Sequence, residues 1–236
     1  MPQLHTPRFP NFAQFDTYIV RNELNYFIQS KAEDFKGTIL DIGCGRMPYK
    51  DWILSNTPAT SYTGLDIDNP IYNDDVFKPD MYWDGITIPS KNEKYDTVML
   101  IEVLEHCEFP EKVIAEAHRV LKPNGTLIFT VPFLFYYHDV PYDFNRFSYY
   151  KLKSLFGHAG FTTDGIIGYG SWNSALAHFW SLWIKRNSLP KVIRFGLYLL
   201  GLPFYFLLYK KKQIQTHLPL HGIAIGHCGV VTKIEK

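Results

Sequence analysis

Short apolar runs alternate with amphipathic segments along most of the chain. Four of these runs predict buried strands: "TILDIG" from residue 38, "SYTGLDID" from 61, "YDTVMLIEV" from 95 and "GTLIFTVPF" from 125. Continuous apolar runs of this length are typical of strands that are covered on both faces. Between the last two, residues 110–125 carry one apolar helical face and end with Pro123 and Gly125. Strands that alternate with helices predict crossover units and a mostly parallel sheet.

Further elements are expected on both sides of this core. Residues 12–35 place apolar side chains at helical spacing, which predicts a helix that ends at Gly37. "MYWDGITIP" predicts a strand end and a loop, and residues 149–159 predict a helix. "FTTDGIIGYGS" and "HGIAIGHCGVVTKIEK" predict two more strands, the second closing the sheet. We expect a helical cover over residues 1–36 and one α/β domain over 37–236, with a helical insertion at about 171–218 before the last strand.

Composition narrows the function classes. The chain has 236 residues, 46% of them apolar, which is enough for a full core. A net charge of +1, with no basic stripe, argues against a nucleic-acid partner. The three cysteines are far apart, which argues against disulfides and a zinc site and favours a reducing, cytoplasmic location. The N-terminus lacks a secretory signal pattern, so secretion is not expected.

The turn "DIGCGRMP" that follows the first predicted strand is the main candidate for a ligand site. An acid at the end of a buried strand, followed by glycines, is the arrangement that open α/β sheets use to hold nucleotide-like cofactors. Gly43 and Gly45 fit the start of the dinucleotide pattern G-x-G-x-x-G, but Pro48 stands in the third glycine's place. Asp41 would repel a pyrophosphate and attract an ammonium group. A nicotinamide oxidoreductase is therefore the less favoured alternative.

A family resemblance follows from four motifs in order. "ILDIGCG" resembles the first motif of class I S-adenosylmethionine-dependent methyltransferases, and "YTGLDID" and "WDGITIP" resemble the next two. The segment from "YDTVMLIEVLEH" to "GTLIFTVPF" is similar to the fourth through fifth strands of the small-molecule, type 11-like branch. The resemblance spans about residues 37–165. It implies S-adenosylmethionine as the cofactor and a Rossmann-like methyltransferase fold, a doubly wound, mostly parallel sheet of seven strands.

The resemblance also assigns cofactor-binding positions. The amino-acid end of the cofactor would be lined by Asp41, Gly43, Cys44 and Gly45. The ribose and adenine would be held by Asp66 and Ile67, and the adenine edge by Asp84 and Gly85. The floor of the site would be formed by Ile101, Glu102 and Val103. A carboxylate suits the ribose position because it accepts hydrogen bonds from two neighbouring hydroxyls. For Glu102 and Glu105 taken singly, a charge at a helix start is an equally good interpretation.

Two places offer catalytic side chains. Methyl transfer from a sulfonium is a displacement that depends on positioning, and a general base is needed only for a poorly ionised acceptor. The candidates are His106 in "VLEH" and His138, Asp139, Asp143 and Arg146 in "HDVPYDFNRF". The alternatives are a structural His106 and a loop held internally by an Arg146–Asp143 pair. No metal ion is expected, because nothing in the spacing of His138, Asp139 and Asp143 demands one.

The loop "HDVPYDFNRF" and the apolar segment 192–209 both bear on the identity of the methyl acceptor. The loop resembles those of methyltransferases in bacterial polysaccharide biosynthesis, which implies O-methylation of a saccharide or a lipid-linked small molecule. Residues 192–209 approach the length of a membrane span and are flanked by "KRNSLPK" and "KKK". Spanning would separate the last strand from its sheet, so the open alternatives are peripheral membrane contact, core packing and a homodimer contact. A non-catalytic cofactor-binding module that docks a membrane or protein partner is the rival function.

Overall fold

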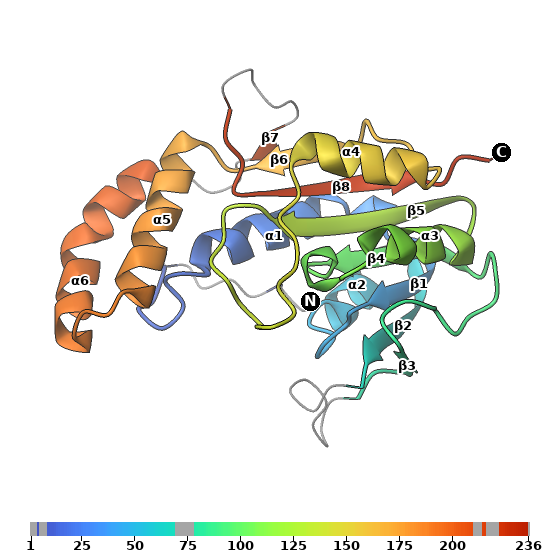
Figure 1. Ribbon diagram of the computed structural model, residues 1–236, viewed down its shortest axis with the longest axis horizontal. Helices are drawn as coiled ribbons and strands as arrows, with labels where there is room; N and C mark the ends of the chain where they lie inside the picture. The colour runs from blue at the N-terminus through green and yellow to red at the C-terminus, as the bar shows by residue number, and fades with distance from the viewer. Residues whose placement is uncertain (1–3, 5–8, 69–77, 210–213, 216–221, 236) are drawn as a thin grey trace.

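The computed structural model describes residues 4, 9–68, 78–209, 214–215 and 222–235, and for 214–215 the backbone alone. Its centre is one sheet with the order β3-β2-β1-β4-β5-β8-β6-β7 (Figure 1). The strands are β1 Gly37–Ile42, β2 Ala59–Ile67, β3 Met81–Trp83, β4 Tyr95–Ile101, β5 Leu121–Pro132, β6 Ile166–Tyr169, β7 Ile214–Gln215 and β8 Gly226–Thr232. The first five strands pair in parallel, and β8 runs antiparallel between β5 and β6.

The expected doubly wound sheet of seven mostly parallel strands is confirmed. Each predicted strand is present, and the reversal of order between β1 and β4 creates the switch point at which such sheets bind ligands. The eighth strand, β7, has two residues and pairs at the edge with β6. It lies inside the predicted insertion.

Helices cover both faces of the sheet. They are α1 Tyr18–Ser30, α2 Lys50–Asn56, α3 Pro110–Val120, α4 Tyr149–His158, α5 Trp172–Arg186 and α6 Lys191–Leu208. Alternate strand positions point to opposite faces. Ile39 and Met99 therefore join the cluster of α1 and α5, whereas Leu40 and Leu100 join the cluster of α3 and α4.

Two predicted boundaries shift in the structure. The helix expected over 12–35 begins only at Tyr18, and a 3-10 turn at Ala32–Asp34 follows it. The short α2 was not predicted, because seven residues give too few turns for a periodic signal. Residues 69–77, and within the insertion 210–213 with "KKK" and 216–218, lie outside the described part. The division at residue 36 stays a prediction.

The insertion before β8 consists of α5 and α6, which pack as a hairpin projecting beyond one end of the sheet (Figure 1). The core-packing alternative for 192–209 is wrong for most of α6, because its buried residues are Tyr198, Gly201 and Tyr205 only. Tyr198 anchors the helix by donating its hydroxyl to the carbonyl oxygen of Pro10 at 2.8 Å. The opposite side of α6 is apolar and exposed.

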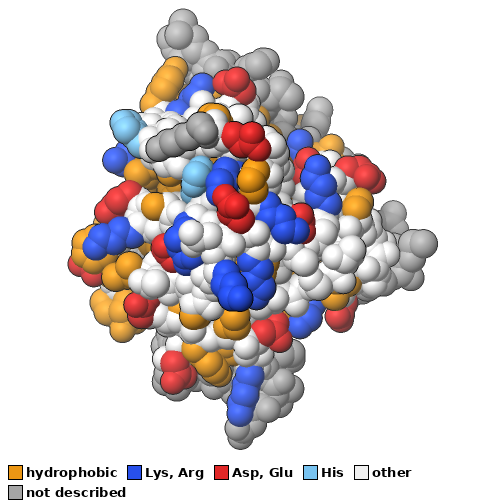
Figure 2. Space-filling model, turned by 90° about the vertical axis from the view of Figure 1, so that its right-hand side faces the viewer, with side chains coloured by type: hydrophobic (Ala, Val, Ile, Leu, Met, Phe, Trp, Pro, Cys, Tyr) orange, Lys and Arg blue, Asp and Glu red, His pale blue; other side chains and the backbone are white. Residues whose placement is uncertain are grey.

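A view of the right-hand side of Figure 1 shows a different surface. Acidic and basic side chains alternate there, and apolar ones form small scattered groups (Figure 2). Such a mixed face is typical of a solvated surface. Large exposed apolar side chains are instead frequent in the hairpin, for example Leu200 and Leu207 in α6.

Candidate active site

The turn after β1 is fixed against the ends of β2 and β4. Gly43 and Gly45 adopt positive φ angles of 68° and 48°, which favour glycine. The amides of Gly43 and Cys44 both donate to the carbonyl of Leu65, at 2.8 and 3.2 Å. A Cβ on Gly43 would lie 2.6 Å from Cγ2 of Val103, so no side chain fits there. The turn thus brings Val103, a predicted floor residue, beside the predicted cofactor glycines.

Asp66 closes the turn from the end of β2. Its Oδ2 accepts a hydrogen bond from the amide of Gly45 at 2.7 Å, and its Oδ1 accepts one from the amide of Ile67 at 2.8 Å. Burial raises the pKa of this carboxyl, and the two amides partly oppose that shift. Each oxygen retains accepting capacity, because an ionised carboxylate offers about four lone-pair sites. Asp66 can therefore bind neighbouring hydroxyl donors without leaving the turn.

Asp41 is buried at the end of β1 and is bonded to Tyr62, whose hydroxyl donates to Oδ2. Burial raises the pKa of Asp41 to about 7, against the opposing effect of this hydrogen bond. A cation placed beside the carboxylate would favour its ionised form and lower that pKa. Tyr62 was missed in the sequence. It stands in an ordinary strand pattern. Only the pairing of Tyr62 in β2 with Ile39 in β1 brings it near Asp41.

Asp84 and Gly85 directly follow β3, which is the edge strand beside β2. Oδ1 of Asp84 accepts the amides of Ile86 and Thr87 at 2.8 and 2.6 Å, which lowers the pKa of this exposed carboxyl. Gly85 has a φ of 82°, and a Cβ there would meet the Ile67 side chain at 3.9 Å. The structure therefore places this pair next to Ile67, as the assignment requires, while its role at the adenine edge stays a prediction.

The end of β4 carries Ile101 and Glu102. Glu102 has a φ of 56°, and its amide donates to the carbonyl and the hydroxyl of Thr130 at 3.0 and 3.1 Å. Its residue surface is partly exposed, but Oε1 is enclosed and lacks a hydrogen-bond partner among the described residues. Burial raises the pKa of this carboxyl to about 7. Such positive φ values in a non-glycine residue concentrate at functional turns.

A second group of side chains gathers where β4 and β5 end. The rings of His106 and His138 have centroids 4.8 Å apart and meet edge to face. Nε2 of His106 lies 3.7 Å from Oε1 of the buried Glu105 and 3.9 Å from Oδ2 of Asp139. Three of the predicted catalytic residues, His106, His138 and Asp139, are thus brought together. Glu105, for which a ligand and a helix-start charge were both open interpretations, joins them.

The other two catalytic candidates hold the loop. Arg146 forms a two-pronged pair with Asp143, with N–O distances of 2.5 and 2.8 Å, and also donates to the carbonyls of Asn145 and Tyr136. The amide of His138 donates to Asp143 at 3.0 Å. The structure therefore contains the internal ion pair that was the alternative interpretation of this loop. A catalytic role for Asp143 or Arg146 stays a prediction.

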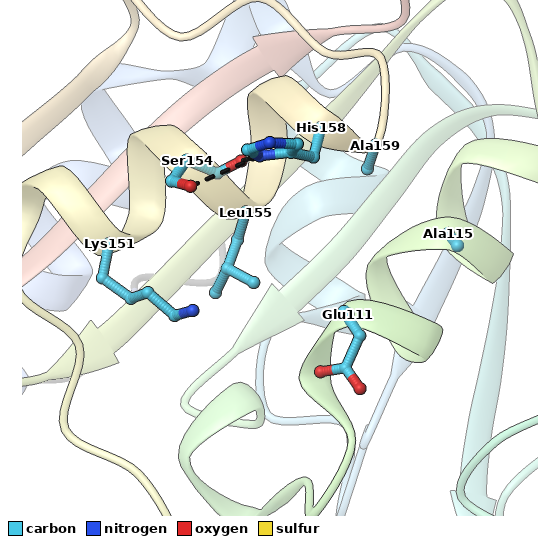
Figure 3. A pocket seen from close by; sticks show the side chains of 7 residues that line it. All are labelled: Glu111, Ala115, Lys151, Ser154, Leu155, His158 and Ala159. Atoms are coloured by element: carbon cyan, nitrogen blue, oxygen red, sulfur yellow. Dashed lines mark hydrogen bonds between the residues drawn. The ribbon is translucent and has the colours of Figure 1, made fainter.

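A surface pocket lies elsewhere, between α3 and α4 (Figure 3). It is lined by Glu111, Ala115, Lys151, Ser154, Leu155, His158 and Ala159. The side chains of Ser154 and His158 are 3.3 Å apart, one helical turn from each other. None of these residues belongs to the predicted site, and the side chains of Ser154 and His158 are partnered along their own helix.

Comparison with known proteins identifies related chains. A family model described as "Methyltransferase domain" matches residues 12–165. "Ubiquinone biosynthesis O-methyltransferase" of Actinobacillus pleuropneumoniae is 31% identical over 44% of this chain and 50% of its own length. The Caenorhabditis elegans protein "2-methoxy-6-polyprenyl-1,4-benzoquinol methylase, mitochondrial" is 26% identical over 44% of this chain and 40% of its own. The chain spans about half the length of the curated relatives it matches.

Solved structures share the fold at low identity. The [4+2]-cyclase SpnF superposes with a TM-score of 0.55 at 16% identity, covering 92% of this chain and 82% of that one. A phosphoethanolamine N-methyltransferase 2 of Haemonchus contortus, in complex with S-adenosylhomocysteine, gives 0.53 at 12% identity, covering 98% and 62%. These likenesses show the fold alone.

Proposed function

Since the chain belongs to the methyltransferase-domain family, we propose that it transfers the methyl group of S-adenosylmethionine to a hydroxyl oxygen of a small, lipid-linked acceptor. At the level of the family, the expected methyltransferase class and the expected cofactor are confirmed. The acceptor and the reaction of the whole protein are part of the proposal. The relatives carry ubiquinone and benzoquinol names, so the saccharide alternative has no support from them.

One observation carries the cofactor side of the proposal, namely the row of Asp41, the glycine turn and Asp66 at the switch point. The enclosed Asp41 offers a carboxylate for the cofactor's ammonium group, and Asp66 offers acceptors for its ribose hydroxyls. The dinucleotide alternative fits less well. Helix α2 begins at Lys50, five residues after Gly45, and has only seven residues with which to face a pyrophosphate.

The acceptor side rests on His106 and His138. Both follow strand ends at the same edge as the cofactor row, where open α/β sheets bind ligands. Burial lowers the pKa of His106, which keeps its ring neutral and able to accept a proton near pH 7. A neutral imidazole can take the proton of a hydroxyl as the oxygen attacks the methyl carbon.

The lipid-linked acceptor is supported by helix α6. It is the one helix of the described chain that is long and apolar enough to cross a membrane by length and composition. Its exposed side includes Leu200 and Leu207, which are 81% and 72% exposed and lie two helical turns apart. Its charged Arg194 is turned to the carbonyl of Lys185 at 2.6 Å. An exposed apolar face of this kind fits the surface of a bilayer, from which a polyprenyl-type acceptor would be drawn.

The test is transfer of a labelled methyl group from S-adenosylmethionine to three acceptors: a short-chain prenylated dihydroxybenzene, the same ring without the chain, and a methyl glucoside. We expect O-methylation of the prenylated ring at the highest rate. Asp66→Asn should reduce transfer at least tenfold, because it removes a charge-assisted acceptor. The exposed His158→Asn is the matched control and should leave the rate unchanged. Cofactor binding with no product from any acceptor would favour the non-catalytic module.

Membrane contact is tested separately by flotation with phosphatidylethanolamine–phosphatidylglycerol vesicles. The wild-type protein should float, and the double variant Leu200→Ser, Leu207→Ser should not. Both side chains are exposed, so the variant should keep its fold. A replacement of the same kind outside the hairpin, Leu54→Ser in α2, where the side chain is 40% exposed, serves as control. A dimer in solution that the double variant converts to monomers, without any flotation, would assign the face to a second copy of the chain instead.

A further inference from the structure

Two carboxyl groups at the end of β4, those of Glu105 and the partly exposed Glu102, have enclosed oxygens that lack hydrogen-bond partners among the described residues. Glu105 has no exposed surface, and neither of its oxygens has a hydrogen-bond partner in the described part of the chain. Buried charges in proteins are paired or bind metal ions. An enclosed, unpartnered carboxyl group beside two imidazoles is therefore an arrangement that a bound cation would satisfy.

The guanidinium of Arg146, which belongs to the same loop as His138, does not fill this need. Its donors are taken by Asp143 and by the carbonyls of Tyr136 and Asn145. Arg146 therefore balances part of the charge from a distance and leaves the oxygens of Glu105 open.

Both histidines present a free ring nitrogen to the same spot. Nδ1 of His106 lies 3.0 Å from the carbonyl oxygen of Tyr142, which can only accept, so this nitrogen carries the proton. Nδ1 of His138 likewise faces acceptors, the carbonyl of Tyr136 at 3.3 Å and Asp143 at 3.4 Å. In each ring Nε2 then keeps its lone pair. Histidines that bind metals typically donate their other N–H to a carbonyl or carboxylate in this way.

We propose that Glu105, His106 and His138 bind a divalent first-row transition-metal ion. One ligand atom from each of the three residues lies within 4.8 Å of the others. Ligands on one ion are about 3 to 3.5 Å apart for bonds of about 2.1 Å, so the side chains close by roughly an ångström on binding. A set of two imidazoles and one carboxylate suits manganese, iron or zinc better than magnesium or calcium.

The site would leave coordination positions open. Three protein ligands occupy one side of an ion, and Asp139, which is half-exposed, marks a route from solvent. This step rests on the proposed function: an open position would bind the hydroxyl oxygen of the acceptor. A bound cation lowers the pKa of such an oxygen and makes it a better nucleophile. The hydroxyl proton would then pass to solvent water as the oxygen ionises, and His106 would act as a ligand of the ion in place of the general base described above.

The experiment is titration of chelator-treated protein with MnCl₂ and, separately, ZnCl₂, followed by calorimetry and, for manganese, by the loss of its free-ion resonance signal. We expect one ion per chain, and at least tenfold weaker binding in His138→Asn and in Glu105→Gln. His158→Asn, on α4 away from the cluster, is the matched control and should bind as wild type.

Two results would overturn the proposal: no stoichiometric binding of either ion by folded wild-type protein, or equal binding by His138→Asn, whose side chain is partly exposed and whose loss leaves the core intact. Titration with S-adenosylmethionine in parallel separates this outcome from the proposed function. Cofactor binding without metal binding would sink the metal site alone, and metal binding without cofactor binding would sink the methyltransferase alone.

Discussion

Gly43→Ala tests how the site is assembled. The new Cβ would lie 2.6 Å from Cγ2 and 3.0 Å from Cγ1 of Val103, and the residue would keep a φ of 68°. The left-handed backbone costs an alanine about 1–2 kcal/mol. Overpacking against Val103 adds about 1–3 kcal/mol. We therefore expect urea unfolding to show a loss of about 2–5 kcal/mol, together with weaker cofactor binding because the floor after β4 must move.

Gly45→Ala is the matched control for this prediction. It has a similar φ of 48°, but nothing lies within 4 Å of the added Cβ. It should therefore lose only the backbone strain of about 1–2 kcal/mol. The double variant Gly43→Ala, Val103→Ala should regain most of the unfolding free energy that Gly43→Ala loses to overpacking. This gain appears as a coupling energy of about 1–3 kcal/mol in a double-mutant cycle. Equal losses for Gly43→Ala and Gly45→Ala, with no coupling to Val103, would refute the contact between the two turns.

Three further predictions follow from buried groups. Burial lowers the pKa of His178 to about 4, so the unfolded chain takes up this proton near pH 6.5 before the native chain does, and stability falls as the pH drops from about 6.5 towards 4. His178→Asn should flatten the pH dependence of unfolding free energy there by up to about 1.4 kcal/mol per pH unit, and an unchanged slope would contradict this. Tyr209→Phe removes the hydroxyl that donates to buried Glu23 at 2.7 Å, so thermal unfolding should show a loss of about 1–3 kcal/mol; no loss would mean that water replaces the donor. Gly201→Ala would bring a Cβ to 2.5 Å from Nε1 of Trp180, so proteolysis should cut the α5–α6 hairpin faster than in wild type, whereas Gly196→Ala, with open space, should not change the rate.

Most of the sheet was predictable because its signal is local. Parallel strands covered on both faces are continuous apolar runs, and each such run became a strand of the sheet. The glycine turn was predictable for the same reason, since Gly43 and Gly45 adopt the positive φ values for which glycine is used. Helix α2 and strand β7 were missed because seven and two residues carry no period.

The cluster of Glu105, His106 and His138 could not be predicted from spacing alone. Residues 105 and 138 are 33 positions apart and meet only because β4 and β5 are neighbours in the sheet. The sequence did contain one usable signal, "EVLEH", in which two acids and a histidine follow a strand end directly. The Arg146–Asp143 pair was one of the two interpretations of the loop, but no pattern reveals that both oxygens of Glu105 are left without a hydrogen-bond partner among the described residues.

The apolar segment 192–209 shows the limit of hydropathy. Its composition is the same whether the helix is buried, lies on a membrane or meets another chain. Only the packing of Tyr198 and Tyr205 against the N-terminal aromatics Phe12 and Phe15 fixes which side is covered. The other side, with Leu200, is thereby exposed, and a surface role follows.

The most direct measurement is calorimetric titration of the protein with S-adenosylmethionine and S-adenosylhomocysteine, beside NAD, for wild type and Asp66→Ala. Asp41 adds a second readout, because an ammonium bound beside a carboxyl whose pKa is about 7 should release a proton, which makes the heat depend on the buffer at pH 6.5. The account predicts one site per chain for both adenosyl ligands, binding lost in the variant and absent for NAD. Folded wild-type protein that binds neither adenosyl ligand would contradict it.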